Sequence, residues 1–202
     1  MARIMNRTKA TVAGLALLGL GAWSLRQCEA APTAGQGEKM YQGTAPELRV
    51  TFSYPEQWPL HEEHGTVESY QAVRIMAPRN SDDTYTSHIS VYGAPLKLHG
   101  GKFDSAEERV DHYKHHLLSG AEVIAEVQRE VGGLQATDLI VSYTIPAIHH
   151  KGIKAAAVHI TERKIVIASP SYLYEVSYTV DQREYDRYAD VFDQLVKSFQ
   201  VQ

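Results

Sequence analysis

The chain has 202 residues, and its 24 Asp and Glu outnumber its 20 Lys and Arg, which gives a formal net charge of −4. A net acidic protein is a poor non-specific ligand for nucleic acid, so we expect no nucleic-acid partner. Cys28 is the single cysteine, which excludes an internal disulfide, so stability must come from an apolar core. A chain of this length can build such a core in one domain.

Residues 1–30 have the features of an export signal. A basic start precedes the apolar run 10–25, which is closed by Arg26. The run is shorter than the ~20 apolar residues that cross a bilayer comfortably, which favours a signal peptide cleaved ahead of Ala31 over a retained anchor. Lipidation of Cys28 is the alternative, although the Arg and Gln before it are not the small residues of bacterial lipoprotein signals. We expect a protein that is periplasmic or anchored to the outer face of the cytoplasmic membrane.

Residues 31–47 are rich in Ala, Gly, Pro, Gln and Glu and have no apolar period, which predicts a flexible tether. Residues 48–202 then form a single domain, because they contain no internal repeat and no second linker. Since residues 1–30 hold four basic residues and one acidic residue, the rest of the chain carries 16 basic and 23 acidic residues, a formal net charge of −7.

Most of the domain shows the period of two that is typical of strands with one buried face. In 172–180, Glu175, Ser177 and Thr179 alternate with tyrosine and valine, so we expect these three polar side chains to face solvent. The glycine pair 132–133 predicts a hairpin turn between antiparallel neighbours. We predict strands at 49–54, 68–77, 86–92, 122–131, 136–145, 157–167 and 172–180. The predicted core face of 122–131 consists of Val123, Ala125, Val127 and Val131.

Two segments show the period of an amphipathic helix instead. The first, 105–118, begins with Ser105 and Glu108 at the spacing of a capping box, and the second, 182–199, begins with a variant of this box at Asp181. The second helix has a wide apolar face that should pack on the sheet. These elements predict an α+β fold, in which a mainly antiparallel sheet is flanked by helices. The tyrosines that we assign to the core rather than to an interface are Tyr174, Tyr178, Tyr185 and Tyr188.

The two ends of the domain resemble the PsbP-like superfamily. An aromatic strand that runs into Pro-x-x-Trp opens the domain, and a Tyr-rich strand and helix close it. The residues that carry the resemblance are Phe52, Tyr54, Pro55, Trp58, Tyr174, Tyr178, Tyr185, Tyr188, Phe192, Ser198 and Phe199. The resemblance implies a PsbP-like α/β/α sandwich and, because the superfamily mostly supplies modules for binding or assembly, a non-enzymatic role. These are packing residues, so they support a fold more strongly than a function.

The densest group of histidines falls on the first predicted helix. Glu108, His112 and His116 are spaced four apart and His115 lies beside them, so we expect all four on the solvated side of the helix. Two histidines and a carboxylate at this spacing can chelate a divalent metal. The alternative, which we favour, is an ordinary polar face, because an exposed chelate lacks the supporting hydrogen bonds and dry surroundings of a catalytic metal. We therefore expect no cofactor.

Two further histidine groups fall in predicted loops. Residues 149–151, with the sequence His-His-Lys, lie in the connection 147–156, where they are either a pH-dependent positive patch or an ordinary solvated hairpin tip. His61 and His64 flank two glutamates in another predicted loop. For both groups we favour the ordinary solvated loop.

No catalytic motif stands out in the sequence. It contains neither the Gly-x-Ser-x-Gly elbow of hydrolases nor a Gly-x-Gly-x-x-Gly or phosphate-binding loop. Cys28 is either removed with the signal peptide or acylated as a lipoprotein cysteine. In both cases we expect the folded domain to have no cysteine nucleophile. We therefore expect that the protein is not an enzyme.

These observations favour an exported accessory module that binds rather than catalyses and assists an envelope or membrane protein complex. The sequence does not identify that complex. The alternative is a periplasmic binder of a small molecule or lipid, for which Trp58 is the ligand candidate, since it is the only tryptophan after residues 1–30. The least favoured class is a metal-dependent hydrolase that uses His112.

Overall fold

The structure is a computed structural model that describes residues 37–65, 69–80, 85–150 and 153–202. The chain divides into two compact units, Met1–Ala30 and Ala31–Gln202, and all the described residues belong to the second. The predicted export signal, including Cys28, lies outside the described residues. In the described ranges no helix is both long and apolar enough to cross a membrane.

The described residues form strands, two α-helices and three short 3-10 helices. The strands are β1 (Glu38–Gln42), β2 (Val50–Pro55), β3 (Leu60–Gly65), β4 (Tyr70–Arg79), β5 (Thr86–Pro95), β6 (Glu122–Val131), β7 (Leu134–Ile145), β8 (Ile148–His150), β9 (Ile153–Ala155), β10 (Val158–Ala168), β11 (Tyr172–Asp181) and β12 (Gln200–Val201). The helices are η1 (Pro46–Leu48), η2 (Lys97–His99), α1 (Ala106–His115), η3 (Gln182–Glu184) and α2 (Tyr185–Ser198).

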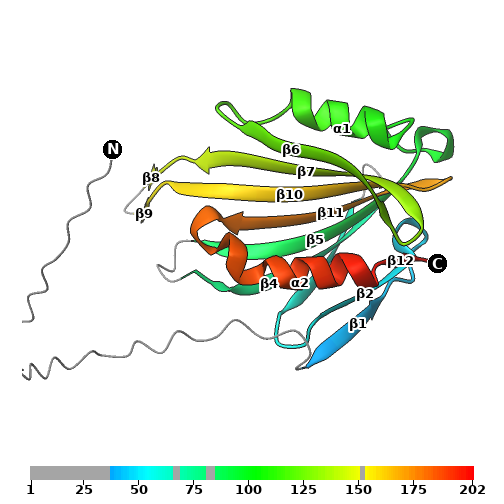
Figure 1. The fold of residues 1–202 in the computed structure, drawn as a ribbon, viewed down its shortest axis with the longest axis horizontal. Coiled ribbons are helices and arrows are strands. Elements are labelled where there is room, and N and C mark those ends of the chain that lie inside the picture. The colour runs from blue at the N-terminus through cyan, green and yellow to red at the C-terminus, as the bar shows by residue number, and fades with distance from the viewer. Residues whose placement is uncertain (1–36, 66–68, 81–84, 151–152) are drawn as a thin grey trace, which may run out of the picture. The chain divides into compact units, whose positions relative to one another are not determined.

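The main sheet has seven antiparallel strands in the order β3-β4-β5-β11-β10-β7-β6 (Figure 1). Neighbours in this order are mostly close in sequence, and the pairing of β5 with β11 joins the two halves. Gly132 and Gly133 have φ of 57° and 80° and form the predicted turn between β6 and β7. The predicted α+β fold with a mainly antiparallel sheet flanked by helices is confirmed.

A second sheet, in the order β1-β2-β12, joins the two ends of the described chain. The prediction that 31–47 is a flexible tether is wrong for residues 38–42, because these form β1 and pair with β2. The segment is mostly polar, but one apolar side chain within it and another directly after it anchor it to the core. Tyr41 stacks on Phe52 with a ring-centroid distance of 4.9 Å, and Leu48 is fully buried.

The main core lies between the seven-stranded sheet, the small sheet and α2. Tyr174 and Tyr178 of β11 and Tyr188 of α2 are buried in it as predicted, and Tyr185 is half-buried against it. The second predicted helix begins later than expected, because the 3-10 helix η3 precedes α2 and has Asp181 as its N-cap.

Helix α1 packs on the opposite face of the main sheet, over β7 and β10. It begins as predicted, since the Ser105 hydroxyl accepts a hydrogen bond of 3.2 Å from the backbone N–H of Glu108. The polar half of the same sheet face lies beside this helix and forms the candidate site described below. The residues of the small core under α1 are Ala106, Val110, Leu139, Val166 and Leu173.

Two predictions about strand faces are wrong. Glu175, Ser177 and Thr179 of β11 do not face solvent but are 4%, 5% and 8% exposed, because β11 is central and side chains of neighbouring elements lie over it. Conversely, Val123 and Val127 on the predicted core face of β6 are 40% and 56% exposed. β6 is an edge strand, and a bulge after Val123 shifts its alternation.

Candidate functional site

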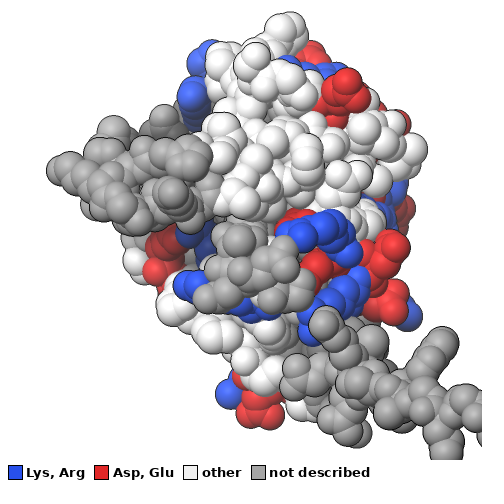
Figure 2. All heavy atoms as spheres, turned by 90° about the vertical axis from the view of Figure 1, so that its left-hand side faces the viewer, with Lys and Arg blue, Asp and Glu red and all other residues white. Residues whose placement is uncertain are grey.

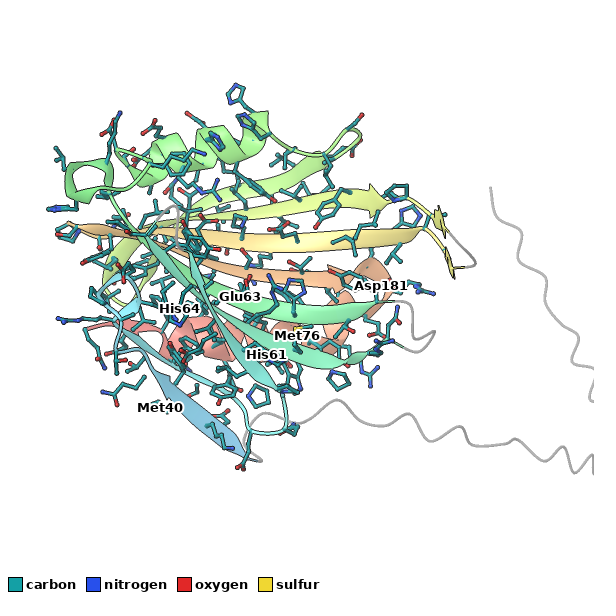
Figure 3. The ribbon with its side chains drawn as sticks, turned by 180° about the vertical axis from the view of Figure 1, so that it is seen from behind. Met40, His61, Glu63, His64, Met76 and Asp181 are labelled. Atoms are coloured by element: carbon teal, nitrogen blue, oxygen red, sulfur yellow. The ribbon has the colours of Figure 1, made fainter. Side chains whose placement is uncertain are left out.

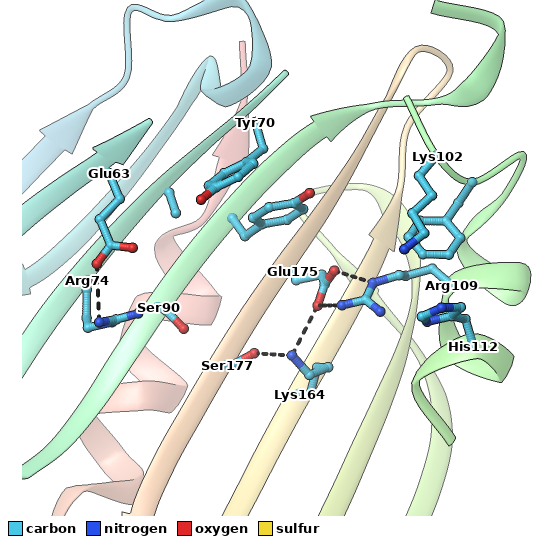
Figure 4. Close-up of a pocket in the computed structure, with 13 residues that line it drawn as sticks. Glu63, Tyr70, Arg74, Ser90, Lys102, Arg109, His112, Lys164, Glu175 and Ser177 are labelled. Carbon is cyan, nitrogen blue, oxygen red and sulfur yellow. Dashed lines mark hydrogen bonds and ion pairs between the residues drawn. The ribbon is translucent and has the colours of Figure 1, made fainter. Parts of the chain in front are cut away.

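A cleft of about 370 Å³ opens between α1 and the polar side of β4, β5 and β11 (Figure 4). The loop that precedes α1 contributes to its rim. The charged residues that line it are Glu63, Arg74, Lys102, Arg109, Lys164 and Glu175. The other lining residues are Tyr70, Ala72, Ser90, Tyr92, Phe103, His112 and Ser177.

Glu175 is the centre of an ion-pair network in the cleft. Arg109 of α1 donates two hydrogen bonds to it, Nε to Oε1 at 2.5 Å and Nη2 to Oε2 at 3.0 Å. Lys164 of β10 donates from Nζ to Oε2 of Glu175 at 3.0 Å and to Oγ of Ser177 at 2.9 Å. The same Nζ lies 3.3 Å from Oε1 of Glu162. Two cations and two carboxylates thus balance each other, all with side chains 20% exposed or less.

The contact between Lys164 and Ser177 has the residue types of a Ser-Lys catalytic pair, but the lysine is held in its charged form. Burial by itself lowers the pKa of Lys164, yet Glu175 and Glu162 outweigh burial, so this pKa is raised above its ordinary value. Burial raises the pKa of Glu175, but Lys164 and Arg109 outweigh it and lower this pKa. A protonated lysine cannot accept the proton of a serine, so the pair lacks the general base of a nucleophilic site.

Lys102 brings a further positive charge to the rim of the cleft. Its Nζ lies 5.5 Å from the ring centroid of Phe103, and the guanidinium carbon of Arg109 lies 5.2 Å from the same centroid. Among the described residues no carboxylate forms an ion pair with Lys102. Two cations therefore converge on one aromatic ring, and only Arg109 has its charge balanced by a neighbour.

His112 completes the α1 side of the cleft. Its ring meets Phe103 edge-on at a centroid distance of 5.1 Å and stacks on His116 at 4.0 Å. Nδ1 of His112 is buried, and no described residue hydrogen-bonds to it. Burial lowers the pKa of His112, and the positive charges of His116, Lys102 and Arg109 lower this pKa further. The imidazole is therefore neutral at pH 7, with a polar nitrogen that a ligand can satisfy.

Of the three candidate metal ligands on this helix, His112 and His116 lie together, whereas Glu108 points away from them. Oε2 of Glu108 accepts a hydrogen bond of 2.6 Å from the backbone N–H of Asp104, so it turns back to the start of the helix. Nδ1 of His116 donates to the backbone carbonyl of His112 at 2.7 Å. In the described part of the chain no group of three or more His, Cys, Asp or Glu is arranged to hold a metal ion. His112 also leaves the predicted solvated face and lines the cleft, while metal binding stays a prediction.

The opposite wall of the cleft, on β3, β4 and β5, carries an ion pair and aromatic rings. Nη1 of Arg74 lies 3.2 Å from Oε1 of Glu63. Tyr70 lies between this pair and the α1 side of the cleft (Figure 4), and its ring centroid is 5.3 Å from that of Tyr92. A ligand in the cleft would therefore contact aromatic surface on one side and cations on the other.

The balance of charge in the cleft differs from that of the whole domain. Four cations and two carboxylates line it, and Glu162 balances Lys164 from outside the lining, which leaves a formal charge of +1 with His112 neutral. The chain after residue 30 carries a formal net charge of −7. On the face drawn in Figure 2, Lys and Arg lie next to Asp and Glu rather than apart from them. The positive excess is thus a local property of the cleft.

Trp58, the predicted ligand candidate, lies in the main core and does not line the cleft. It is 2% exposed, and its ring meets Tyr188 edge-on at a centroid distance of 5.2 Å. The sheet therefore separates Trp58 from the cleft, because the core with α2 and the cleft with α1 occupy opposite faces. A role for Trp58 in ligand binding stays a prediction.

The remaining histidine groups also lie apart from the cleft lining. His61 and His64 are part of β3, which pairs with β4, so the loop predicted for them is wrong (Figure 3). His149 and His150 belong to β8, which pairs with β9 in the predicted hairpin, and Lys151 lies outside the described residues.

Sequence reasoning missed the residues that make this cleft. Lys102 is in a loop, Arg109 in a helix and Lys164 in a strand, and only the fold brings them together. One signal was available in the sequence. Glu175 is a charged residue between Tyr174 and Val176 in a largely apolar half of its strand, and such a residue is buried only when it is paired.

No family model and no curated protein matches this chain. Solved structures with a similar fold include a protein of Bacteroides thetaiotaomicron VPI-5482, with 13% identity, a TM-score of 0.47 and coverage of 83% of this chain and 49% of that chain. This chain thus spans about half the length of that protein. Another is LpqN, described as involved in cell envelope biogenesis of Mycobacterium tuberculosis, with 14% identity, a TM-score of 0.43 and coverage of 81% and 89%.

A third similar structure is cyanobacterial PsbP from Synechocystis sp. PCC 6803, with 16% identity, a TM-score of 0.47 and coverage of 82% of this chain and 93% of that chain. A PsbP protein is thus among the solved structures that this chain resembles, as the motifs at the two ends of the domain predict. The likeness concerns the fold alone.

Proposed function

We propose that the chain is an exported binding protein that acts without catalysis and takes an organic anion in the cleft between α1 and the main sheet. The observation that carries the proposal is the uncompensated charge of Lys102 beside Arg109 and His112 in an otherwise acidic domain. A cleft rather than a flat patch favours a small molecule, since concave sites bury most of a ligand's surface.

The network beneath Lys102 explains why an anion is preferred over a cation. Arg109, Lys164, Glu175 and Glu162 balance each other, so they neither repel an anion nor attract a cation. Arg109 gives two of its N–H groups to Glu175, and a guanidinium has about five, so others remain for a ligand. Charge-assisted hydrogen bonds contribute about 1.5–3 kcal/mol each, which suffices to orient a carboxylate or phosphate.

The absence of catalysis is supported by the protonation states in the cleft. Lys164 stays protonated beside Ser177, and His112 has no carboxylate that would orient it as a general base among the described residues. An export signal on residues 1–30 would place this cleft in the periplasm or at the outer face of the cytoplasmic membrane.

Calorimetric titration of the full chain with succinate, benzoate and phenyl phosphate tests the proposal. We expect binding that Lys102→Ala weakens roughly tenfold or more, because the variant loses a charge-assisted contact. Lys197→Ala is the matched control, since Lys197 is an exposed lysine on α2, on the opposite face of the sheet. Equal affinity of all three proteins, or no heat of binding with any probe, would contradict an anion site in this cleft.

A second candidate function, an accessory module of an envelope protein complex, is favoured by the edge strand β6. Ile124 and Val127 on this strand are 59% and 56% exposed, and Leu118 just before it is 58% exposed. Edge strands that expose apolar side chains are sites where other chains pair. A partner would gain both backbone hydrogen bonds and apolar contacts there.

Purification of the full chain from gently solubilised membranes tests this second candidate. The expected result is a partner in stoichiometric amount that is lost with Val127→Lys and retained with Gln128→Lys, which places the same charge one position along the strand. A partner retained by both variants would show that β6 is not the contact.

A further inference from the structure

A second, smaller cavity of about 210 Å³ adjoins the cleft and shares Tyr92, Lys102 and Phe103 with it. Its own walls combine the apolar residues Ala94, Pro95 and Leu173 with Ser69 and two glycines. Ala94 of β5 and Leu173 of β11 are cross-strand partners on the α1 side of the sheet, and both line it. Lys102 therefore lies at the junction of the charged cleft and a smaller cavity that is partly apolar.

The turn over the smaller cavity is fixed by backbone contacts. The N–H of Gly101 donates to the carbonyl of Leu96 at 3.0 Å, and the N–H of Lys97 donates to the carbonyl of Phe103 at 2.8 Å. A Cβ placed on Gly101 would lie 1.6 Å from the carbonyl oxygen of Pro95, so the turn approaches β5 as closely as only glycine allows. The cavity is thus formed before any ligand enters, which limits the entropy lost on binding.

We propose that the ligand of the cleft is an amphipathic anion, whose charged group contacts Lys102 and Arg109 and whose apolar group fills the smaller cavity. This inference rests on the proposed function and adds the class of ligand. The three shared residues make the smaller cavity an extension of the charged cleft, so one ligand can occupy both. A purely polar anion would make no use of the apolar surface that Ala94 and Pro95 contribute to the smaller cavity.

The size of the expected effect follows from apolar burial. Each methylene group that moves from water into an apolar cavity raises affinity about fourfold. Affinity should therefore rise with the length of an aliphatic chain attached to the anion and level off once the cavity is filled. The charged head group determines the affinity of the shortest ligand that binds. The cavity determines the slope, which is the gain in the logarithm of the affinity per added methylene group.

The experiment is calorimetric titration of the full chain with two series, n-alkyl carboxylates from acetate to octanoate and the matching n-alkyl phosphates. We expect a rise of about fourfold per methylene in at least one series, and the two series show which head group is preferred. Lys102→Ala should weaken all members of the preferred series by a similar factor and leave the slope in place.

Ala94→Leu should remove the slope and keep the affinity of the shortest binding member, because the added side chain occupies the cavity and leaves the charged cleft intact. Ala157→Leu is the matched control, since Ala157 is exposed and lies outside both cavities, and it should retain the slope. The slope of the unmodified chain does not depend on whether either variant folds. Anions that bind with no dependence on chain length would overturn this inference and leave the proposed function standing, whereas no binding in either series would overturn both.

Discussion

Arg109 of α1 and Glu175 of β11 lie 66 positions apart in the chain and meet in an ion pair of two hydrogen bonds. The pair ties the helix to the centre of the main sheet at the edge of the small core under α1. Lys164 approaches the same carboxylate from β10. One buried carboxylate thus holds two cations from two elements, and the shape of the cleft depends on it.

Glu175→Gln should destabilise the domain by on the order of 3 kcal/mol, because it leaves Arg109 largely buried without its counter-charge and leaves Lys164 with Glu162 alone. Urea unfolding at pH 7 measures the change. Glu63→Gln is the control, since the pair of Glu63 with Arg74 is 44% and 45% exposed and should contribute less than about 1 kcal/mol. Similar losses in the two variants would show that the Glu175 network is as solvated as the surface pair.

Asp181 should make the free energy of unfolding of the domain decrease at acidic pH. Its carboxylate accepts hydrogen bonds from the side chain of Arg183, the backbone of Arg183 and Asn80, of which the Arg183 side chain has the largest effect, and its pKa is lowered from 3.8 to about 2. A lowered folded-state pKa contributes stability that is present above the unfolded pKa and is lost as the pH falls through the folded one. The shift corresponds to about 2 kcal/mol.

Urea unfolding between pH 5 and pH 2 tests this prediction, over a window that spans the two pKa values of Asp181. The unmodified chain should lose about 2 kcal/mol more over this range than Asp181→Asn, which has no carboxylate to protonate. Asp190→Asn, at an exposed position of α2, should retain the steeper dependence. If Asp181→Asn loses as much stability as the unmodified chain, the acid dependence comes from other groups.

Two core tyrosines should respond in opposite ways to loss of their hydroxyl group. The hydroxyl of Tyr178 donates to the backbone carbonyl of Tyr185 at 2.9 Å, whereas no described residue hydrogen-bonds to the buried hydroxyl of Tyr188. We expect Tyr178→Phe to cost about 1 kcal/mol and Tyr188→Phe to be neutral or stabilising by up to about 1 kcal/mol. Thermal and urea unfolding of the two variants provide the comparison. A clear loss of stability in Tyr188→Phe would reveal a partner for that hydroxyl.

Tryptophan emission should distinguish the cleft from the core as the site of a ligand. In a Trp23→Phe background Trp58 is the only tryptophan, and it lies on the opposite face of the main sheet from the cleft. Saturation with an anion that binds calorimetrically should therefore leave the emission maximum of Trp58 unchanged. A shift on saturation would instead favour a ligand beside Trp58.

The sequence predicts the order and type of most elements of this fold because local periodicity determines them. Strand 122–131 agrees with β6 residue by residue, and the helix predicted at 182–199 contains α2. The strand at 38–42 was missed, because its polar side chains show no apolar alternation and only Tyr41 anchors it to the core.

The candidate site was not predictable from local pattern. Whether Glu175 faces solvent or is buried depends on the register of β11 against β10, which places Lys164 opposite Ser177. It depends also on the position of α1, which brings Arg109 over the sheet. Polar residues at every second position are expected both for a face in solvent and for a face covered by charged partners. The prediction of a solvent-facing Glu175 was therefore wrong.

The small sheet places β12, the last strand of the chain, beside β2, one of the first. The backbone N–H of Ser53 also bonds to the hydroxyl of Ser198 across 145 positions. At a synthesis rate of ~5–20 residues per second, β2 waits on the order of 10 s or more for these partners to be made. The small sheet therefore cannot form until residues 200–201 have been synthesised, however early β2 leaves the ribosome.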